Sequence, residues 1–203
     1  MRLLLDEESY DKVTILVRRL LPLEHAKLQQ RVIDFDRLDE YVDLIRAHDI
    51  FCCLGTTMKK AGSQDAFKKV DFEYTCNVAR IASANGAEQL LIVTSLGADP
   101  GSRIFYSRVK GNVEEAVANL RFRGVHIFRP SMLLGHRDEF RIEDHLVAPL
   151  AKLFSFAMIG RWKKFRAIEA GTVARAMISV AKQNLTGVNV FESDQIQAVG
   201  ISH

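Results

Sequence analysis

The chain has 203 residues, enough for one domain with a full-sized core. It is 48% hydrophobic and 26% charged, which is the balance of a soluble globular protein, and its formal net charge of +3 gives no ground for expecting nucleic acid as a partner. No apolar run approaches the roughly 18 residues that a membrane span needs, and the first residues lack the features of a signal peptide.

Short runs of branched apolar residues alternate along the chain with longer stretches of helical spacing. In chain order we predict strands at 13–17, 31–33, 49–55, 89–95, 124–130 and 187–193, and helices near 37–47, 66–85, 105–121 and 171–183. Several of the strands are apolar on consecutive positions, which indicates burial on both faces. The alternation therefore predicts one α/β domain spanning 1–203, with an open parallel sheet between helices.

Three cysteines, Cys52, Cys53 and Cys76, include an adjacent pair and make a poor disulfide framework. We read them as reduced thiols, which favours a cytoplasmic location.

In open parallel sheets, ligands bind outside the carboxyl ends of the strands. The residues that follow each predicted strand should then line one crevice. They are Arg18 and Arg19, Asp34 and Phe35, Gly55 to Thr57, Ser95, and Arg129 to Leu133.

The stretch "YSRVK" places Tyr106 and Lys110 four residues apart, on one face of the predicted helix. A free phenol has a pKa of about 10, and a nearby ammonium lowers the pKa of a phenol. Such a tyrosine could exchange a proton with a carbonyl or alcohol oxygen while hydride moves, and Ser95 could hold the same oxygen. The pair alone is more typical of an ordinary solvated helix. Its position directly after a strand that ends at Ser95 favours catalysis.

The order of Ser95, Tyr106-x-x-x-Lys110 and Arg129-Pro130 resembles the short-chain dehydrogenase/reductase superfamily. The runs "FCCLGTT", "TSLGAD", "YSRVKGNVEE" and "FRPSMLLG" are similar to its atypical members, grouped with the Tat-interacting-protein oxidoreductases and their bacterial relatives. The resemblance runs from about residue 3 to 193. It implies a Rossmann-like fold, a catalytic set of Ser95, Tyr106 and Lys110, and a small carbonyl or alcohol substrate.

The resemblance also implies a dinucleotide lying across the strand ends. Arginines after the strand at 13–17 suit a 2′-phosphate, so we expect NADP, with NAD possible, although two solvated arginines would look the same. Asp34 and Phe35 would flank the adenine, and Leu54, Gly55 and Thr56 would approach the ribose and pyrophosphate. Tyr106, Lys110, Arg129, Pro130, Ser131, Met132 and Leu133 would lie toward the nicotinamide.

Two departures from the family pattern stand out. Asp71 occupies a helical region where many relatives have an asparagine, and all twelve glycines come at or after position 55, so the glycine-rich phosphate loop and the strand before it are missing. In the family sheet order, 3-2-1-4-5-6, this strand lies in the middle. We expect Met1 to be an internal methionine of a longer protein; the alternative is a natural variant that has lost dinucleotide binding.

The sequence therefore leaves two functions open, an NADP-dependent oxidoreductase and a dinucleotide-sensing or scaffolding protein with little turnover. The substrate cannot be read from the small substrate-side segment at about 131–170. Within it, His136 and His145 fit no tight metal-ligand motif, so no metal is expected, and "RWKKFR" at 161–166 favours a subunit or substrate-loop contact over nucleic acid. A monomer and a homodimer are both compatible with the sequence.

Overall fold

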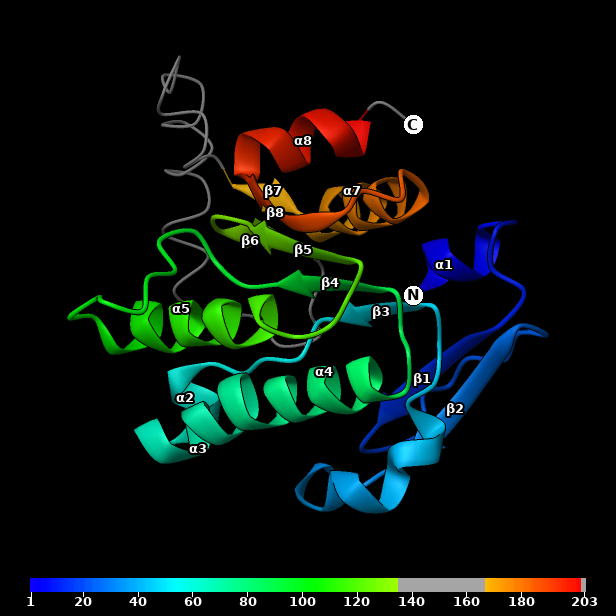
Figure 1. Ribbon diagram of the computed structural model, residues 1–203, viewed down its shortest axis with the longest axis horizontal. Coiled ribbons are helices and arrows are strands. Elements are labelled where there is room, and N and C mark those ends of the chain that lie inside the picture. The colour runs from blue at the N-terminus through cyan, green and yellow to red at the C-terminus, as the bar shows by residue number, and fades with distance from the viewer. Residues whose placement is uncertain (135–166, 202–203) are drawn as a thin grey trace.

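Three parallel sheets organise the chain in a computed structural model that describes residues 1–134 and 167–201 (Figure 1). The largest has the strand order β3-β4-β5-β8, a second contains β1 and β2, and a third pairs β6 with β7. Their bounds are β1 Val13–Val17, β2 Leu28–Val32, β3 Asp49–Cys52, β4 Gln89–Val93, β5 Gly124–Arg129, β6 Leu133–Leu134, β7 Ile168–Glu169 and β8 Gly187–Glu192.

Helices connect these strands and cover the four-stranded sheet. They are α1 Arg2–Asp6, η1 Phe35–Leu44, α2 Met58–Ala61, α3 Gln64–Lys68, η2 Lys69–Tyr74, α4 Thr75–Ala84, α5 Phe105–Ala118, α7 Ala170–Lys182 and α8 Ser193–Ile201. The parallel strands and covering helices form a Rossmann-like α/β fold, as the sequence predicts. None of the helices in the described part of the chain is long and apolar enough to cross a membrane.

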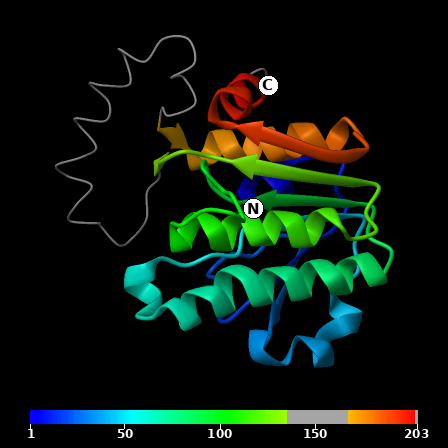
Figure 2. The ribbon, with the colours of Figure 1, turned by 60° about the vertical axis from the view of Figure 1, so that its left-hand side comes forward.

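The two faces of the four-stranded sheet are buried under different helices (Figure 2). Leu90 and Ile92 point to one face and pack with residues of α4 and α5, including Val113. Leu91 lies between them in the chain and packs on the other face against Met177 and its neighbours in α7. Successive strand residues point to opposite faces, so the consecutive apolar residues of β4 serve both layers.

Three predicted elements differ from the structure. The strand predicted at 49–55 ends at Cys52. The helix expected at 37–47 is a 3₁₀ stretch with non-helical backbone at Arg37 and Tyr41. Its large apolar or aromatic residues recur every third position, at Phe35, Leu38, Tyr41 and Leu44, which suits the three-residue turn of a 3₁₀ helix. Strand β2 begins at Leu28 rather than 31, because the polar residues Gln29 and Gln30 obscured its first half.

A chain of polar side chains crosses the amino-terminal ends of the strands. His126 is fully buried on β5, and its Nε2 lies 3.0 Å from Gln89 Oε1. Gln89 Nε2 donates to Asp49 Oδ1 at 3.0 Å, and the Tyr10 hydroxyl donates to Asp49 Oδ2 at 2.7 Å. Burial lowers the pKa of His126 and raises that of Tyr10. This chain of contacts ties the segment before β1 to the four-stranded sheet.

Candidate functional site

The carboxyl ends of β4 and β5 stay joined beyond the strands themselves. Thr94 N–H donates to the Phe128 carbonyl at 2.8 Å, and Leu96 N–H donates to the Pro130 carbonyl at 2.9 Å. Ser131 N–H donates to Ser193 Oγ at 2.6 Å, which anchors the following segment to the start of α8. These bonds hold Ser95 and the Arg129–Ser131 segment at one edge of the sheet, where the sequence places the crevice.

Ser95 carries a buried hydroxyl with no partner. Among the described residues its Oγ is the single buried side-chain polar atom without a hydrogen bond. A buried hydroxyl without a partner is costly, so it needs a reason to be there. The turn after Ser95 packs on the first turns of α5, because Asp99 N–H donates to the Ser107 carbonyl at 3.1 Å.

Helix α5 presents Tyr106 and Lys110 in different surroundings. Tyr106 is 39% exposed, and its ring lies 5.6 Å from that of Phe67 on α3. Lys110, one turn later, is only 6% exposed. The tyrosine can therefore reach a ligand from solvent, while the lysine can act only from within the site.

The Lys110 ammonium is held by a carboxylate that the sequence pointed to but did not place in the site. Lys110 Nζ lies 2.7 Å from Asp71 Oδ1, and Asp71 is 1% exposed. Thr56 N–H donates to Asp71 Oδ2 at 2.7 Å. Asp71 belongs to η2, a π-helical turn, and such turns are frequent at functional sites. The carboxylate thus links α5 to the loop after β3.

Gly55 lets that loop approach the ion pair closely. A Cβ added at Gly55 would lie 3.3 Å from Asp71 Oδ1 and 3.8 Å from Lys110 Nζ. The "LGTT" stretch therefore brings its backbone beside the two buried charges. Leu54 and Thr56 on either side are partly buried.

Arg129 forms an ion pair with a second buried carboxylate, that of Glu114. Its Nε donates to Glu114 Oε1 at 3.0 Å, a further guanidinium nitrogen contacts Oε2, and Thr94 Oγ1 donates to Oε1 at 2.6 Å. The hydrogen bond to Glu114 raises the pKa of Arg129. The guanidinium fixes α5 against β5, so its described contacts position the helix that carries Tyr106.

The residues expected near the adenosine lie at the end of the smaller sheet. Arg18 and Arg19 directly follow β1 and are exposed. Asp34 caps η1, accepting from Asp36 N–H at 2.9 Å, and Phe35 is buried with its ring 5.6 Å from that of Tyr74. The two arginines are therefore free to meet a solvent-borne anion, whereas Phe35 forms part of the core.

The far side of the site is described only in part. Pro130 is buried, and Met132 and Leu133 are exposed by 43% and 38%. Most of the substrate-side segment predicted at about 131–170, with His136, His145 and the stretch 161–166, lies outside the described residues. Within residues 1–134 and 167–201, no group of three His, Cys, Asp or Glu side chains could hold a metal ion.

Gly111 sets how closely α5 approaches the turn after β4. A Cβ at this position would lie 2.2 Å from both Asp99 C and Pro100 N, which are backbone atoms that cannot swing away. We expect Gly111→Ala to lower the free energy of unfolding by about 1–3 kcal/mol through overpacking. Gly171→Ala, in the first turn of α7 where the nearest atom is the flexible Arg175 Nη1 at 3.5 Å, serves as the matched control and should be neutral or stabilising. Chemical denaturation of both variants compares them, and equal stabilities would contradict the close approach.

Comparisons with known proteins identify relatives of the chain. HTATIP2 of Rattus norvegicus is 38% identical over 180 residues, covering 87% of this chain and 72% of that protein. FMP52, mitochondrial, of Saccharomyces cerevisiae is 32% identical over 133 residues, covering 64% of this chain and 57% of that protein. No protein-family model matches the chain.

Two solved structures with a similar architecture contain NAD. MoeE5 in complex with UDP-glucose and NAD superposes with a TM-score of 0.66 at 14% identity, covering 96% of this chain and 74% of that one. The Bordetella bronchiseptica enzyme WbmH in complex with NAD⁺ gives a TM-score of 0.68 at 14% identity, covering 95% and 70%. At this level of identity the likeness establishes the Rossmann-like fold alone.

Proposed function

We propose that this chain, which belongs to the family of HTATIP2, is an NADP-dependent oxidoreductase that transfers hydride between the dinucleotide and a carbonyl or alcohol substrate. The observation that carries the proposal is the buried, unpartnered Ser95 hydroxyl at the end of β4, beside the helix that carries Tyr106 and Lys110. A hydroxyl that lacks a partner in the protein is suited to bind a substrate oxygen.

The roles of the three residues follow from their surroundings. Ser95 would donate to the substrate oxygen and orient it, and the exposed Tyr106 hydroxyl would exchange a proton with that oxygen. Lys110 would place its positive charge beside the nicotinamide ribose. A bound nicotinamide would supply or accept the hydride.

Two groups of residues support the binding of a dinucleotide, one suited to the adenosine 2′-phosphate and one to the ribose and pyrophosphate. Arg18 and Arg19 offer exposed cations where β1 ends, and Gly55 offers backbone without a side chain beside Asp71 and Lys110. NAD in the structures with the same fold supports a nicotinamide cofactor for this chain. The preference for NADP rests on the two arginines.

The choice of cofactor can be tested with those arginines. We expect the Arg18→Ala, Arg19→Ala double variant to lose at least about tenfold in affinity for NADPH relative to NADH, because a charged hydrogen bond contributes about 1.5–3 kcal/mol and only NADPH carries the 2′-phosphate. Titration of the protein with each cofactor, followed by the fluorescence of the reduced nicotinamide, measures both affinities. Arg121→Ala removes an exposed charge before β5, at the opposite edge of the sheet, and should leave the ratio unchanged. Equal losses for the two cofactors would show that Arg18 and Arg19 do not bind the phosphate.

A second candidate function, dinucleotide sensing without turnover, is favoured by one observation. The Lys110 ammonium is paired with Asp71 inside the protein, an arrangement that could hold the dinucleotide-binding loop without serving Tyr106. The two functions differ in outcome. A sensor binds NADPH and transfers no hydride, whereas an oxidoreductase does both.

The substrate class proposed here is a small carbonyl compound or alcohol, and the protein is proposed to act as a monomer or homodimer. A cytoplasmic location stays a prediction, while the names of the fungal relatives place those proteins in mitochondria.

A further inference from the structure

The buried ion pair of Lys110 and Asp71 joins three segments of the candidate site. Lys110 lies on α5 and Asp71 on η2, and Lys110 Nζ is 2.7 Å from Asp71 Oδ1. The other carboxylate oxygen accepts the Thr56 N–H, so Asp71 also holds the loop after β3. The two side chains are only 7% and 1% exposed, so water screens their charges poorly. The carboxylate therefore affects the charge that this part of the site presents to a ligand.

The Lys110 ammonium retains donors for a ligand. An ammonium carries three N–H donors, and within residues 1–134 and 167–201 Asp71 is the only ion-pair partner of Lys110. Gly55 leaves space beside it, since a Cβ at that position would lie 3.8 Å from Nζ. Asp71 lies deeper in the protein than Lys110, because its residue is 1% exposed against 6%. Asp71 would therefore act on a bound dinucleotide through its charge and through Lys110, without touching it.

A nicotinamide ring changes its charge when it is oxidised. The reduced ring is neutral and the oxidised ring carries one positive charge, so charged groups of a protein near the ring tune its chemistry. An unpaired ammonium nearby would favour binding of the reduced form, and an unpaired carboxylate would favour the oxidised form. The opposite charges of an ion pair largely cancel. The pair thus lets a lysine bind the cofactor without excluding its oxidised form.

We propose that Asp71 is a specificity-determining residue for the oxidation state of the cofactor. Its negative charge offsets that of Lys110 and strengthens the binding of NADP⁺ relative to NADPH. The inference rests on the proposed function, because it takes the nicotinamide to lie beside Lys110.

A consequence for the proposed reaction follows from the same charge. When hydride passes to the carbonyl carbon, the ring left behind becomes a cation, and the carbonyl oxygen takes a proton from Tyr106, which regains one from water. A fixed negative charge near the ring stabilises the charge that develops there. Asp71 therefore makes the bound reduced cofactor a better hydride donor and favours reduction of the carbonyl compound.

The affinities for NADP⁺ and NADPH test the proposal without any substrate. Calorimetric titration of the full chain and of Asp71→Asn gives the dissociation constant of each form. In Asp71→Asn the ratio of the NADP⁺ constant to the NADPH constant should rise by about tenfold. A unit charge roughly 10 Å away, at an effective dielectric constant of about 20, changes a binding constant by about this factor. Asparagine keeps an acceptor for the Thr56 N–H, so the loop keeps its contact.

Lys110→Met provides the opposite change in charge. It leaves the Asp71 carboxylate without its cation, so the same ratio should fall by about tenfold. The double variant with both substitutions has neither charge, and its ratio should return to within about threefold of that of the unaltered protein. A purely structural role for Asp71 would weaken both forms alike and would not produce changes of opposite sign.

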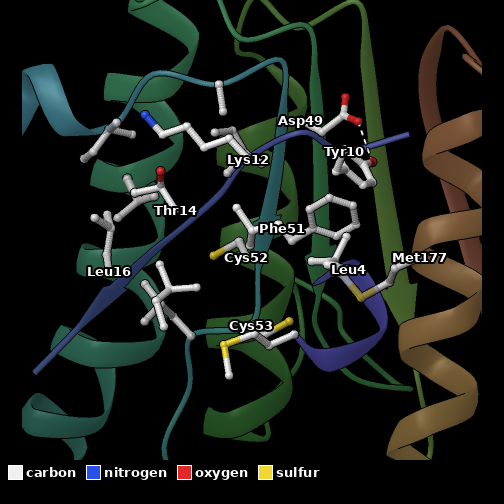
Figure 3. A pocket seen from close by; sticks show the side chains of 18 of the residues that line it. Leu4, Tyr10, Lys12, Thr14, Leu16, Asp49, Phe51, Cys52, Cys53 and Met177 are labelled. Carbon is white, nitrogen blue, oxygen red and sulfur yellow. Dashed lines mark hydrogen bonds between the residues drawn. The ribbon is translucent and has the colours of Figure 1, made fainter. Parts of the chain in front are cut away.

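Asp49→Asn is the matched control, because it removes the same charge from the opposite end of β3. Figure 3 shows Asp49 at the start of this strand, bonded to Tyr10, and Cys53 beyond the other end, from which the chain continues to Gly55. Salt screens charges over such a separation, so the ratio should change by less than about twofold. Circular dichroism spectra establish that each variant is folded.

Three results would overturn the inference. A ratio in Asp71→Asn within about twofold of that of the unaltered protein, with both forms still bound, would contradict it and leave the oxidoreductase proposal intact. A shift of the same sign in Lys110→Met and Asp71→Asn would do the same. Failure of the unaltered chain to bind either form would overturn the inference together with the proposed function.

Discussion

The Tyr106→Phe variant is expected to reduce carbonyl substrates at least about 100-fold more slowly than the unaltered protein, while NADPH binds within a few fold. Only the phenolic oxygen is lost, and proton transfer by a positioned side chain typically contributes 10²–10⁴-fold to a rate. The ring stays packed on Phe67, so the start of α5 should keep its place. Steady-state rates with any substrate that the protein turns over, together with an NADPH titration, measure both quantities.

Tyr41→Phe provides the matched control, since it removes a phenolic oxygen from η1, at a distance in the chain from the site. Its rate should equal that of the unaltered protein. Unchanged turnover in Tyr106→Phe would remove Tyr106 from the mechanism, whatever its effect on stability.

The largest loss of stability is expected for Asp71→Ala. The change leaves the Lys110 ammonium buried without its counter-charge and the Thr56 N–H without its acceptor. Removing one partner of a buried ion pair typically costs about 3–5 kcal/mol. Chemical denaturation followed by circular dichroism should therefore show a loss of that size in the free energy of unfolding, with an unchanged slope against denaturant.

Asp43→Ala is the control for this variant, because the Asp43–Arg46 ion pair has side chains that are 88% and 65% exposed. Exposed pairs contribute about 0–1 kcal/mol. A loss of less than about 1 kcal/mol in Asp71→Ala would show that the buried pair does not stabilise the site. The Asp71→Asn variant keeps an acceptor for the Thr56 N–H. Its loss in the free energy of unfolding should therefore lie between the losses of Asp71→Ala and Asp43→Ala.

The strands that are buried on both faces were the easiest elements to predict from the sequence. Consecutive apolar residues such as Leu90, Leu91 and Ile92 are needed only by a strand buried on both faces, and β4 lies where they predict it. The polar start of β2, around Gln29 and Gln30, carries no such signal, because this strand is partly exposed.

The positions of the candidate residues in the fold were predictable from the sequence, and their contacts were less so. Ser95 and α5 lie where the strand ends and the Tyr-x-x-x-Lys spacing place them. The pairing of Lys110 with Asp71 could not be read from the sequence, because the two residues meet only when η2 packs on α5. The ion pair between Arg129 and Glu114 is likewise a contact between a strand and a helix, which sequence spacing does not encode.

Deuteride transfer from NADPH tests the central claim most directly. The protein would be incubated with NADPH carrying deuterium at C4, in each of the two stereochemical positions in turn, and with a mixture of aldehydes and ketones. Mass spectrometry of the alcohols detects even slow turnover. The oxidoreductase account predicts deuterium in at least one alcohol with the unaltered protein, from one of the two labelled forms, and at least about 100-fold less with Tyr106→Phe. Saturating NADPH binding with no transfer to any carbonyl, or equal transfer by the protein and by Tyr106→Phe, would contradict it.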